Sequence, residues 1–272
     1  MIVLAQTPDL LGSSPWPVVV ASLSLVGLAL GLSWWLGLGI EREVVIASAR
    51  AAVQLLGVGL IFGFIFEADM ALVLAASWVV VMVVIGGIVV RRRAGGTIPG
   101  LAVVAFVAVA GTAAISLTVA FAFGVFELDP VSLVVVAGIT IGNAVPSAVL
   151  GVKAGKTVCQ DHFGEVEAAL ALGMQRGQVV RFMAPRAART AIIPQVERTK
   201  VVGLIALPGA MTGLLLAGVD PFEAVVIQLV VMYLVLGTAA VCVVSLVATV
   251  VRAAVTPSLR LADWIVPGEG GS

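Results

Sequence analysis

Hydrophobic residues in this chain are gathered into long blocks that are separated by mostly short polar segments. Each block holds about 20 or more largely apolar residues, the length that a helix needs to cross the hydrocarbon core of a bilayer. We expect helices, because open strands would leave their amide groups unpaired in lipid. The pattern therefore predicts an all-α integral membrane protein with about seven transmembrane helices. The predicted spans are Pro17–Leu38, Val44–Phe66, Met70–Val90, Pro99–Val125, Pro130–Val152, Val201–Val219 and Phe222–Val251.

The composition agrees with this class. Hydrophobic residues make up 61% of the chain and charged residues 11%, whereas a soluble domain is roughly half apolar and a quarter charged. A length of 272 residues suits a single polytopic domain over residues 1–272. The two cysteines lie far apart in the sequence, so no disulfide framework is expected.

Charged residues alternate between the connections, and this alternation predicts the orientation. All 15 lysines and arginines lie in or beside the connections after the first, third, fifth and seventh spans. Cytoplasmic loops carry the excess of basic residues in membrane proteins. We therefore expect the N-terminus outside and the C-terminus in the cytoplasm, with the chain in the cell (inner or plasma) membrane. The opposite connections hold only acids, namely Asp9, Glu67, Asp69, Glu127, Asp129, Asp220 and Glu223.

The longest polar segment is residues 153–200, which this orientation places in the cytoplasm as a loop between the fifth and sixth spans. It contains Glu167-Ala168-Ala169 and, after three intervening residues, Gly173. This spacing is similar to that of the EAA loop of ABC-transporter permeases, with which the cytosolic ATPase couples. Pro185 follows the glycine by 12 residues, against thirteen in that loop's consensus. We therefore expect Glu167, Ala168, Ala169 and Gly173 to form an ATPase-coupling helix, with an ordinary surface helix as the alternative.

The residues around this motif predict how the helix is built. Asp161 is expected to cap it, and Gly173 to end it. Val166, Ala169 and Leu170 share one face and are small enough to seat in a groove of a partner. Downstream, Gln178–Ile193 is a basic amphipathic stretch that Pro185 is expected to break, and that we place along the inner membrane surface.

Polar and sulfur-containing side chains gather near predicted breaks in the fifth and sixth spans, at Pro146 and at Pro208-Gly209. Oxygens, amides and thioethers at such breaks suit a path for a cation. The alternative is hydrogen bonding between helices, with methionine as core filler. The candidate pathway residues are Thr140, Asn143, Ser147, Pro208, Met211, Thr212, Gln228 and Met232.

Arg50 and Gln54 lie one turn apart on the second span, with Glu43 two turns before Arg50. A charge in a span points into the bundle or extends to the headgroups. Arg50 therefore has either a structural role, paired with Glu43 or at the interface, or a role in gating.

Three further patterns bear on energy supply and chemistry. The segment Gly151–Thr157 reads GVKAGKT, one residue short of a phosphate-binding GxxxxGK[ST] loop, and it follows a membrane helix instead of a strand. We expect no cofactor on this chain, so that ATP and Mg²⁺ would bind to a separate ATPase. Cys159 and His162 supply only two metal-ligand types, so no metal site is expected. We find no nucleophile–base pair and no nucleic-acid patch, and we expect no enzymatic activity.

The middle of each predicted span lacks Asp and Glu, and the only histidine, His162, lies in the polar segment. Proton-coupled carriers relay protons through such groups. The pattern therefore disfavours a proton-driven carrier and favours an external energy source.

The run from Arg189 to Ala240, with its LPGAMTG motif and downstream VDP, closely resembles the FetB-type ABC permeases, which include bacterial iron exporters and plant aluminium-tolerance half-transporters. Ile141–Val152 and Arg50–Phe62 also resemble blocks of that family. One position departs from it, because Val145-Pro146 stands where the family often has Met-Asn. If that position contacts substrate, we expect a different cargo.

This resemblance implies a permease subunit that pairs with a cytosolic ATPase, two copies of each per transporter. It also implies export of iron or another metal ion. The competing hypothesis is a partner-independent channel or secondary carrier for small cations.

Overall fold

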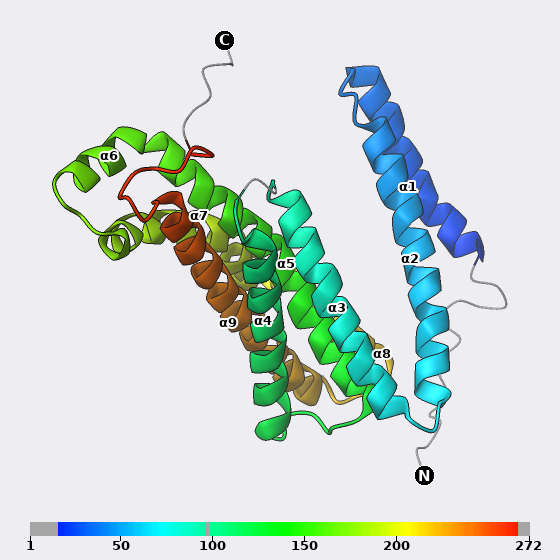
Figure 1. The fold of residues 1–272 in the computed structure, drawn as a ribbon. Coiled ribbons are helices and arrows are strands. Elements are labelled where there is room, and N and C mark those ends of the chain that lie inside the picture. The colour runs from blue at the N-terminus through cyan, green and yellow to red at the C-terminus, as the bar shows by residue number, and fades with distance from the viewer. Residues whose placement is uncertain (1–15, 96–97, 266–272) are drawn as a thin grey trace. The chain divides into compact units, whose positions relative to one another are not determined.

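The computed structural model describes residues 16–95 and 98–265, so Asp9 lies outside the described residues. The described part is helical and contains no strand beyond two isolated bridges, Val202↔Ala206 and Val255↔Leu261. The all-α prediction is therefore confirmed. The helices (Figure 1) are α1 Trp16–Leu36, α2 Glu41–Glu67, α3 Ala71–Arg93, α4 Leu101–Ala122, α5 Pro130–Asp161, α6 Phe163–Ala171, α7 Arg176–Val201, α8 Gly209–Leu216 and α9 Pro221–Ala254.

Within the described residues, six helices are long and apolar enough to cross a membrane: α1, α2, α3, α4, α5 and α9. The predicted sixth span, Val201–Val219, is not a single helix. Helix α7 ends at Val201, residues 202–208 form turns, and α8 is only 8 residues long. Gly203 takes a left-handed conformation with φ of 89°, and Pro208 offers no amide hydrogen for a continued helix. The count of seven spans is therefore not confirmed.

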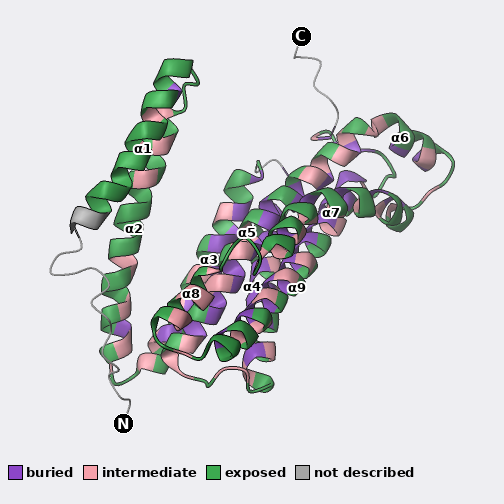
Figure 2. Cartoon of the chain, turned by 180° about the vertical axis from the view of Figure 1, so that it is seen from behind, coloured by how far each residue is buried: buried purple, intermediate pink, exposed green. Residues whose placement is uncertain are grey.

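The chain divides into two compact units. In the first, α1 and α2 contact each other, and the Ser33 hydroxyl donates to the Glu41 carboxylate at 2.6 Å. The second contains α3–α7, α9 and most of α8. Helices α4, α5, α7 and α9 pack against one another there, and Figure 2 shows their buried residues facing inward.

Helix α5 begins at Pro130, as predicted, and is longer than expected at its C-terminal end. It runs through Pro146 without a break and continues past Val152 to Asp161. Tertiary packing explains the continuity, because buried residues occur along its whole length. The segment that resembles a phosphate-binding loop is thus part of a helix, and its amide groups cannot wrap a phosphate.

The glycines of that segment serve helix packing. A Cβ added at Gly151 would lie 3.5 Å from the Val243 and Val247 side chains, and one added at Gly155 would lie 3.1 Å from Val250 Cγ1. Small residues four apart let two helix backbones approach closely, here α5 and α9. By contrast, a Cβ added at Gly138, Gly142, Gly209 or Gly213 would have no such close neighbour.

Helix α7 differs most from its prediction. It is one continuous helix from Arg176 to Val201 that contains both Pro185 and Pro194. It packs against α5 and α9, instead of lying apart along the membrane surface and breaking at Pro185. The prolines are exposed, and the opposite face is buried at every fourth residue, which holds the helix together. These buried residues are Val179, Met183, Ala187, Ala191 and Gln195.

Candidate functional site

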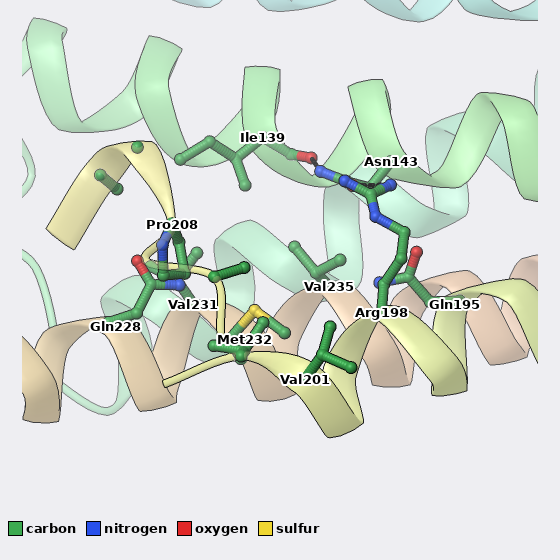
Figure 3. Close-up of a pocket in the computed structure, with 14 residues that line it drawn as sticks. Ile139, Asn143, Gln195, Arg198, Val201, Pro208, Gln228, Val231, Met232 and Val235 are labelled. Atoms are coloured by element: carbon green, nitrogen blue, oxygen red, sulfur yellow. Dashed lines mark hydrogen bonds between the residues drawn. The ribbon is translucent and has the colours of Figure 1, made fainter. Parts of the chain in front are cut away.

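A pocket of about 340 Å³ lies where α5, α7, α9 and the turn segment before α8 meet. Its walls are mainly apolar, and they include the helix break at Pro208-Gly209. The polar and sulfur-bearing residues that line it are Asn143, Gln195, Arg198, Gln228 and Met232 (Figure 3). The volume lies near the lower end of the roughly 300–1,000 Å³ typical of small-molecule sites.

The structure divides the predicted pathway residues into two groups. Asn143, Pro208, Gln228 and Met232 line the pocket. The other four do not. The Thr140 hydroxyl is buried between α4 and α5, 3.0 Å from the Ser116 hydroxyl, and the Ser147 hydroxyl donates to the Asn143 carbonyl at 3.2 Å.

Met211 and Thr212, on α8, complete the second group. Both are half-buried, and the Thr212 hydroxyl donates to the Pro208 carbonyl at 3.1 Å. It thereby satisfies one of the carbonyls near the helix break. A role in substrate contact stays a prediction for all eight residues.

Two polar residues of the pocket, Gln195 and Arg198, were not among the sequence-based candidates, and both come from α7. Gln195 is only 5% exposed. Arg198 Nη1 donates to Asn143 Oδ1 at 3.4 Å, which links α7 to α5 across the pocket (Figure 3). The four-residue spacing of buried residues that ends at Gln195 is the signal that identifies this face of α7.

Arg198 belongs to the segment that was predicted to be a cytoplasmic connection, and it contacts α5 far from either helix end. Its partner Asn143 lies about 20 Å from the first residue of α5 and about 27 Å from the last, at 1.5 Å per residue. Arg198 is therefore level with the middle of α5. The exposed Glu197–Lys200 ion pair, with a distance of 2.7 Å, lies in the same turn of α7. Among the described residues, α7 is not one of the helices long and apolar enough to cross a membrane, so the prediction about acids within spans does not concern this pair.

Gln228 contributes an unusual group to the pocket. The residue is 5% exposed, and its Oε1 atom is buried without a hydrogen-bond partner among the described residues. Buried polar atoms almost always have a partner, from the protein or from water. This acceptor has less than 1 Å² of accessible surface, so a molecule in the pocket does not reach it. In the described part of the chain, no group of three or more His, Cys, Asp or Glu side chains is placed to hold a metal ion.

Helix α6 contains the EAA-like motif. As expected, the segment is helical and is followed by Gly173 in a left-handed conformation, with φ of 90°. The expected Asp161 cap is wrong, because Asp161 is the last residue of α5 and His162 occupies the cap position. The two helices therefore follow each other almost directly.

The face of α6 that was expected to seat in a partner packs against its own chain. Val166 and Leu170 are buried in a cluster with residues of α5, α7 and α9, so the expectation for these two residues is wrong. The opposite side is open. Glu167 and Ala168 are exposed, Leu172 is 89% exposed, and a shallow groove runs between α6 and Leu259–Leu261.

Ionic contacts fix α6 to α7. Glu165 accepts from Arg186 at 3.3 Å and lies 3.0 Å from His162. Slight desolvation tends to raise the pKa of Glu165, but the hydrogen bond from Arg186 and the contact with His162 outweigh it and lower that pKa. The carboxylate is therefore ionised at neutral pH.

The remaining predicted residues lie on α2 and α5. Arg50 and Gln54 are exposed, and no ion pair joins Arg50 to Glu43 among the described residues. A gating role for Arg50 stays a prediction.

At the position that departs from the family pattern, Val145 packs toward Gly86 of α3: its Cγ2 atom would lie 3.1 Å from a Cβ added at Gly86. Neither Val145 nor Pro146 lines the pocket.

Comparison with known proteins identifies the family of this chain. Residues 16–255 match the family described as "Uncharacterised protein family (UPF0014)". The chain belongs to UPF0014. One UPF0014 relative is the membrane protein STAR2 of Oryza sativa subsp. japonica, 35% identical over 82% of this chain and 77% of that protein. Another is the protein ALUMINUM SENSITIVE 3 of Arabidopsis thaliana, 32% identical over 81% of this chain and 80% of that protein.

A third UPF0014 relative is the probable iron export permease protein FetB of Escherichia coli K12, 29% identical over 80% of this chain and 83% of that protein. The resemblance to FetB-type permeases is thus confirmed. The long apolar helices of the described residues, together with the name of the STAR2 relative as a membrane protein, indicate a multi-pass membrane protein. No solved structure matches the chain.

Proposed function

We propose that this UPF0014 chain is the membrane subunit of an ABC transporter that a separate cytosolic ATPase energises, and that it exports iron or another metal ion. The observation that carries the proposal is α6, an EAA-spaced helix whose Glu167 and Ala168 are exposed. The name of the FetB relative, an iron export permease, supports the cargo class. A homodimer of this chain with two ATPase copies is the expected assembly.

The contacts of α6 give the proposal a mechanical basis. Only His162 separates α6 from α5, and the Glu165–Arg186 pair joins it to α7. Helix α7 in turn extends to the pocket, where Arg198 contacts Asn143. ATP-driven movement of a partner against α6 would therefore be transmitted along α5 and α7 to the pocket, whose helix break at Pro208 would absorb the change.

Stimulation of the partner's ATPase activity tests the coupling. Ala168→Arg adds a bulky charge on the exposed side of α6, and we expect it to reduce stimulation of the purified ATPase to the level of the ATPase alone. Leu128→Arg is the matched control, because Leu128 is exposed and lies just before the N-terminal end of α5, the end remote from α6. This variant should leave stimulation intact. Equal stimulation by wild type and Ala168→Arg would contradict the assignment of α6 as the ATPase-coupling helix.

The cargo is tested by adding iron, other divalent metals and nucleotide sugars to the reconstituted complex. We expect the metals to raise its ATPase rate. If no metal does so, the metal assignment fails while the permease assignment stands.

The second candidate function is a partner-independent channel or carrier. The Glu197–Lys200 pair, in the same turn of α7 as Arg198 of the pocket, favours it, since ionisable groups beside a transport path are typical of carriers. It predicts transport by this chain alone in liposomes without ATP.

A further inference from the structure

A second pocket, here named the basic pocket, lies between the N-terminal part of α7 and the C-terminal part of α9. Its volume is about 260 Å³, and its lining includes Arg181 of α7 and Arg252 of α9 but no carboxylate. The Arg176 guanidinium donates to the Arg252 carbonyl at 3.0 Å, which fastens the start of α7 to the end of α9. Neither Arg181 nor Arg252 forms an ion pair among the described residues. Two positive charges from two helices therefore converge on this pocket.

The basic pocket continues into an apolar groove between the same two helices. This α7–α9 groove has a volume of about 440 Å³, and Arg181 lines both spaces. The groove extends along α9 to Val244, about 12 Å from Arg252 at 1.5 Å per residue. Its other lining residues are small or apolar: Val180, Ala184, Pro185, Ala188 and Ala248. The two spaces together form a site with a cationic end and an apolar body.

The level of the basic pocket along α9 corresponds to the end of a membrane span. Gly151 of α5 lies beside Val247 of α9, and Gly155 lies beside Val250. Lys153, between the two glycines, is therefore level with the basic pocket. It also ends the apolar run of its own span, and cationic residues at span ends lie among the lipid headgroups. The basic pocket is thus at headgroup depth, and the groove leads from it toward the hydrocarbon core.

An anionic phospholipid has the chemistry that this site selects. Arginine binds phosphate well, and basic pockets between helices at the membrane surface recognise anionic headgroups. A free phosphate would leave the apolar groove uncovered, and a zwitterionic lipid would bring a cation to two arginines. A two-fold contact of this face with a second copy of the chain would place like charges on both sides of the interface.

We propose that one anionic phospholipid binds here, with its phosphate between Arg181 and Arg252 and one acyl chain in the α7–α9 groove. With the predicted orientation, this lipid belongs to the inner leaflet. The bound lipid joins the amphipathic α7 to the spanning α9 at the membrane surface. The inference is independent of the proposed transport function, because it involves neither the ATPase nor the cargo.

Native mass spectrometry of the full-length chain in detergent micelles tests the proposal. The probes are dioleoyl phosphatidylglycerol, dioleoyl phosphatidylcholine, dihexanoyl phosphatidylglycerol and glycerophosphate. We expect one saturable site for dioleoyl phosphatidylglycerol, with an affinity at least about tenfold above that of the phosphatidylcholine. Glycerophosphate, which has no acyl chain to cover the groove, should bind much more weakly than either phosphatidylglycerol.

Variants of the basic pocket separate a specific site from general attraction of arginines to anionic lipid. Arg181→Gln and Arg252→Gln should each weaken binding of dioleoyl phosphatidylglycerol about fivefold, because each removes one charge at the headgroup. Arg189→Gln is the matched control, since Arg189 is an exposed arginine of the same helix and lines neither space. This variant should bind the lipid as wild type does.

A variant of the groove tests the position of the acyl chain. Ala188→Leu fills the part of the groove that lies farther along α7 from Arg181. It should weaken binding of the dioleoyl lipid but not of the dihexanoyl lipid, whose retained binding shows that the variant is folded. Unchanged binding of the dioleoyl lipid would contradict the assignment of the groove.

Three other results would overturn the proposal: equal affinities for phosphatidylglycerol and phosphatidylcholine, equal losses in Arg181→Gln and Arg189→Gln, or binding of glycerophosphate as tight as that of the lipid. The last result would make the basic pocket a site for a free anion. A disulfide between two copies of Ala188→Cys, formed without added lipid, would show that the groove is an interface between subunits and would also exclude the lipid site.

Discussion

At the scale of single residues, two aspartates determine where the central helices begin. The Asp129 carboxylate accepts from the amides of Val131 and Ser132 at 2.8 and 3.0 Å. Asp220 likewise accepts from the amides of Phe222 and Glu223. Each aspartate precedes a proline that opens the helix, which is a favourable arrangement at a helix N-terminus. Two acids that were expected only to mark the outer side of the membrane are therefore helix caps.

We predict that Asp129→Ala lowers the free energy of unfolding by about 1 kcal/mol, the usual value of an N-cap, and that Asp129→Asn costs less because its amide oxygen still accepts. Partial burial tends to raise the pKa of Asp129, but hydrogen bonds from Ser132 and Val131 outweigh it and lower that pKa. The charge-dependent stabilisation is thus present above the unfolded pKa of about 3.9 and is lost as the pH falls through the lower folded value.

Thermal unfolding in detergent at neutral and acidic pH measures this effect. The difference between wild type and Asp129→Ala should narrow at acidic pH. A difference that does not change with pH would contradict the assignment of the charged cap.

The sequence predicted some residue roles and missed others for physical reasons. A glycine three residues after a short helical motif is a strong stop signal, and Gly173 adopts the expected left-handed conformation. Arg198 was missed because a basic residue beside a polar segment is usually cytoplasmic. Only the tertiary contact with Asn143 shows that it lies level with the middle of α5.

At the scale of elements, long apolar helices were predicted well and α7 was not. Hydropathy detects a helix that faces lipid, whereas α7 buries a narrow, mostly apolar stripe and exposes charges on its other side. Its stripe from Val179 to Gln195 has the period of a helix face, but polar residues between its members hide it. Likewise, Pro146 and Pro185 favour breaks locally, and tertiary packing overrides them.

We predict that Gly155→Val destabilises the contact between α5 and α9. A Cβ at Gly155 already lies 3.1 Å from Val250, and overpacking of this kind typically costs about 1–3 kcal/mol. Gly142→Val, on the same helix with nothing within 4 Å of its Cβ position, carries the same change in helix propensity without the clash. The midpoint of thermal unfolding should fall for Gly155→Val relative to Gly142→Val, and equal midpoints would show that α9 yields to the added side chain.

At the scale of the whole molecule, the distribution of charge predicts the orientation, which labelling can test. The native cysteines, Cys159 and Cys242, are buried, so background labelling should be low. In intact cells, a membrane-impermeant maleimide should modify Leu128→Cys, which is exposed before α5. It should modify Leu172→Cys, next to α6, only after the cells are permeabilised. The reverse pattern would place α6 outside and remove it from the reach of a cytosolic ATPase.

The family was predictable from the sequence because its motifs are long and specific, and the match over residues 16–255 agrees. The pocket was only half predictable. Asn143, Gln228 and Met232 could be chosen as polar or sulfur-bearing residues within spans, but their convergence with Gln195 and Arg198 depends on how α7 packs. The positive charge at the pocket therefore depends on the tertiary structure.

The polar character of α7 also has a consequence for how the chain is made. The insertion machinery partitions segments into the bilayer by their hydrophobicity, so we expect that it does not insert the polar α7 by itself. Helix α9, which supplies part of its buried partner surface, is synthesised after it. A nascent chain halted before Pro221 would hold α7 without that surface, and we expect membrane proteases to degrade it. The pocket is therefore completed late in synthesis, only once α9 has left the ribosome.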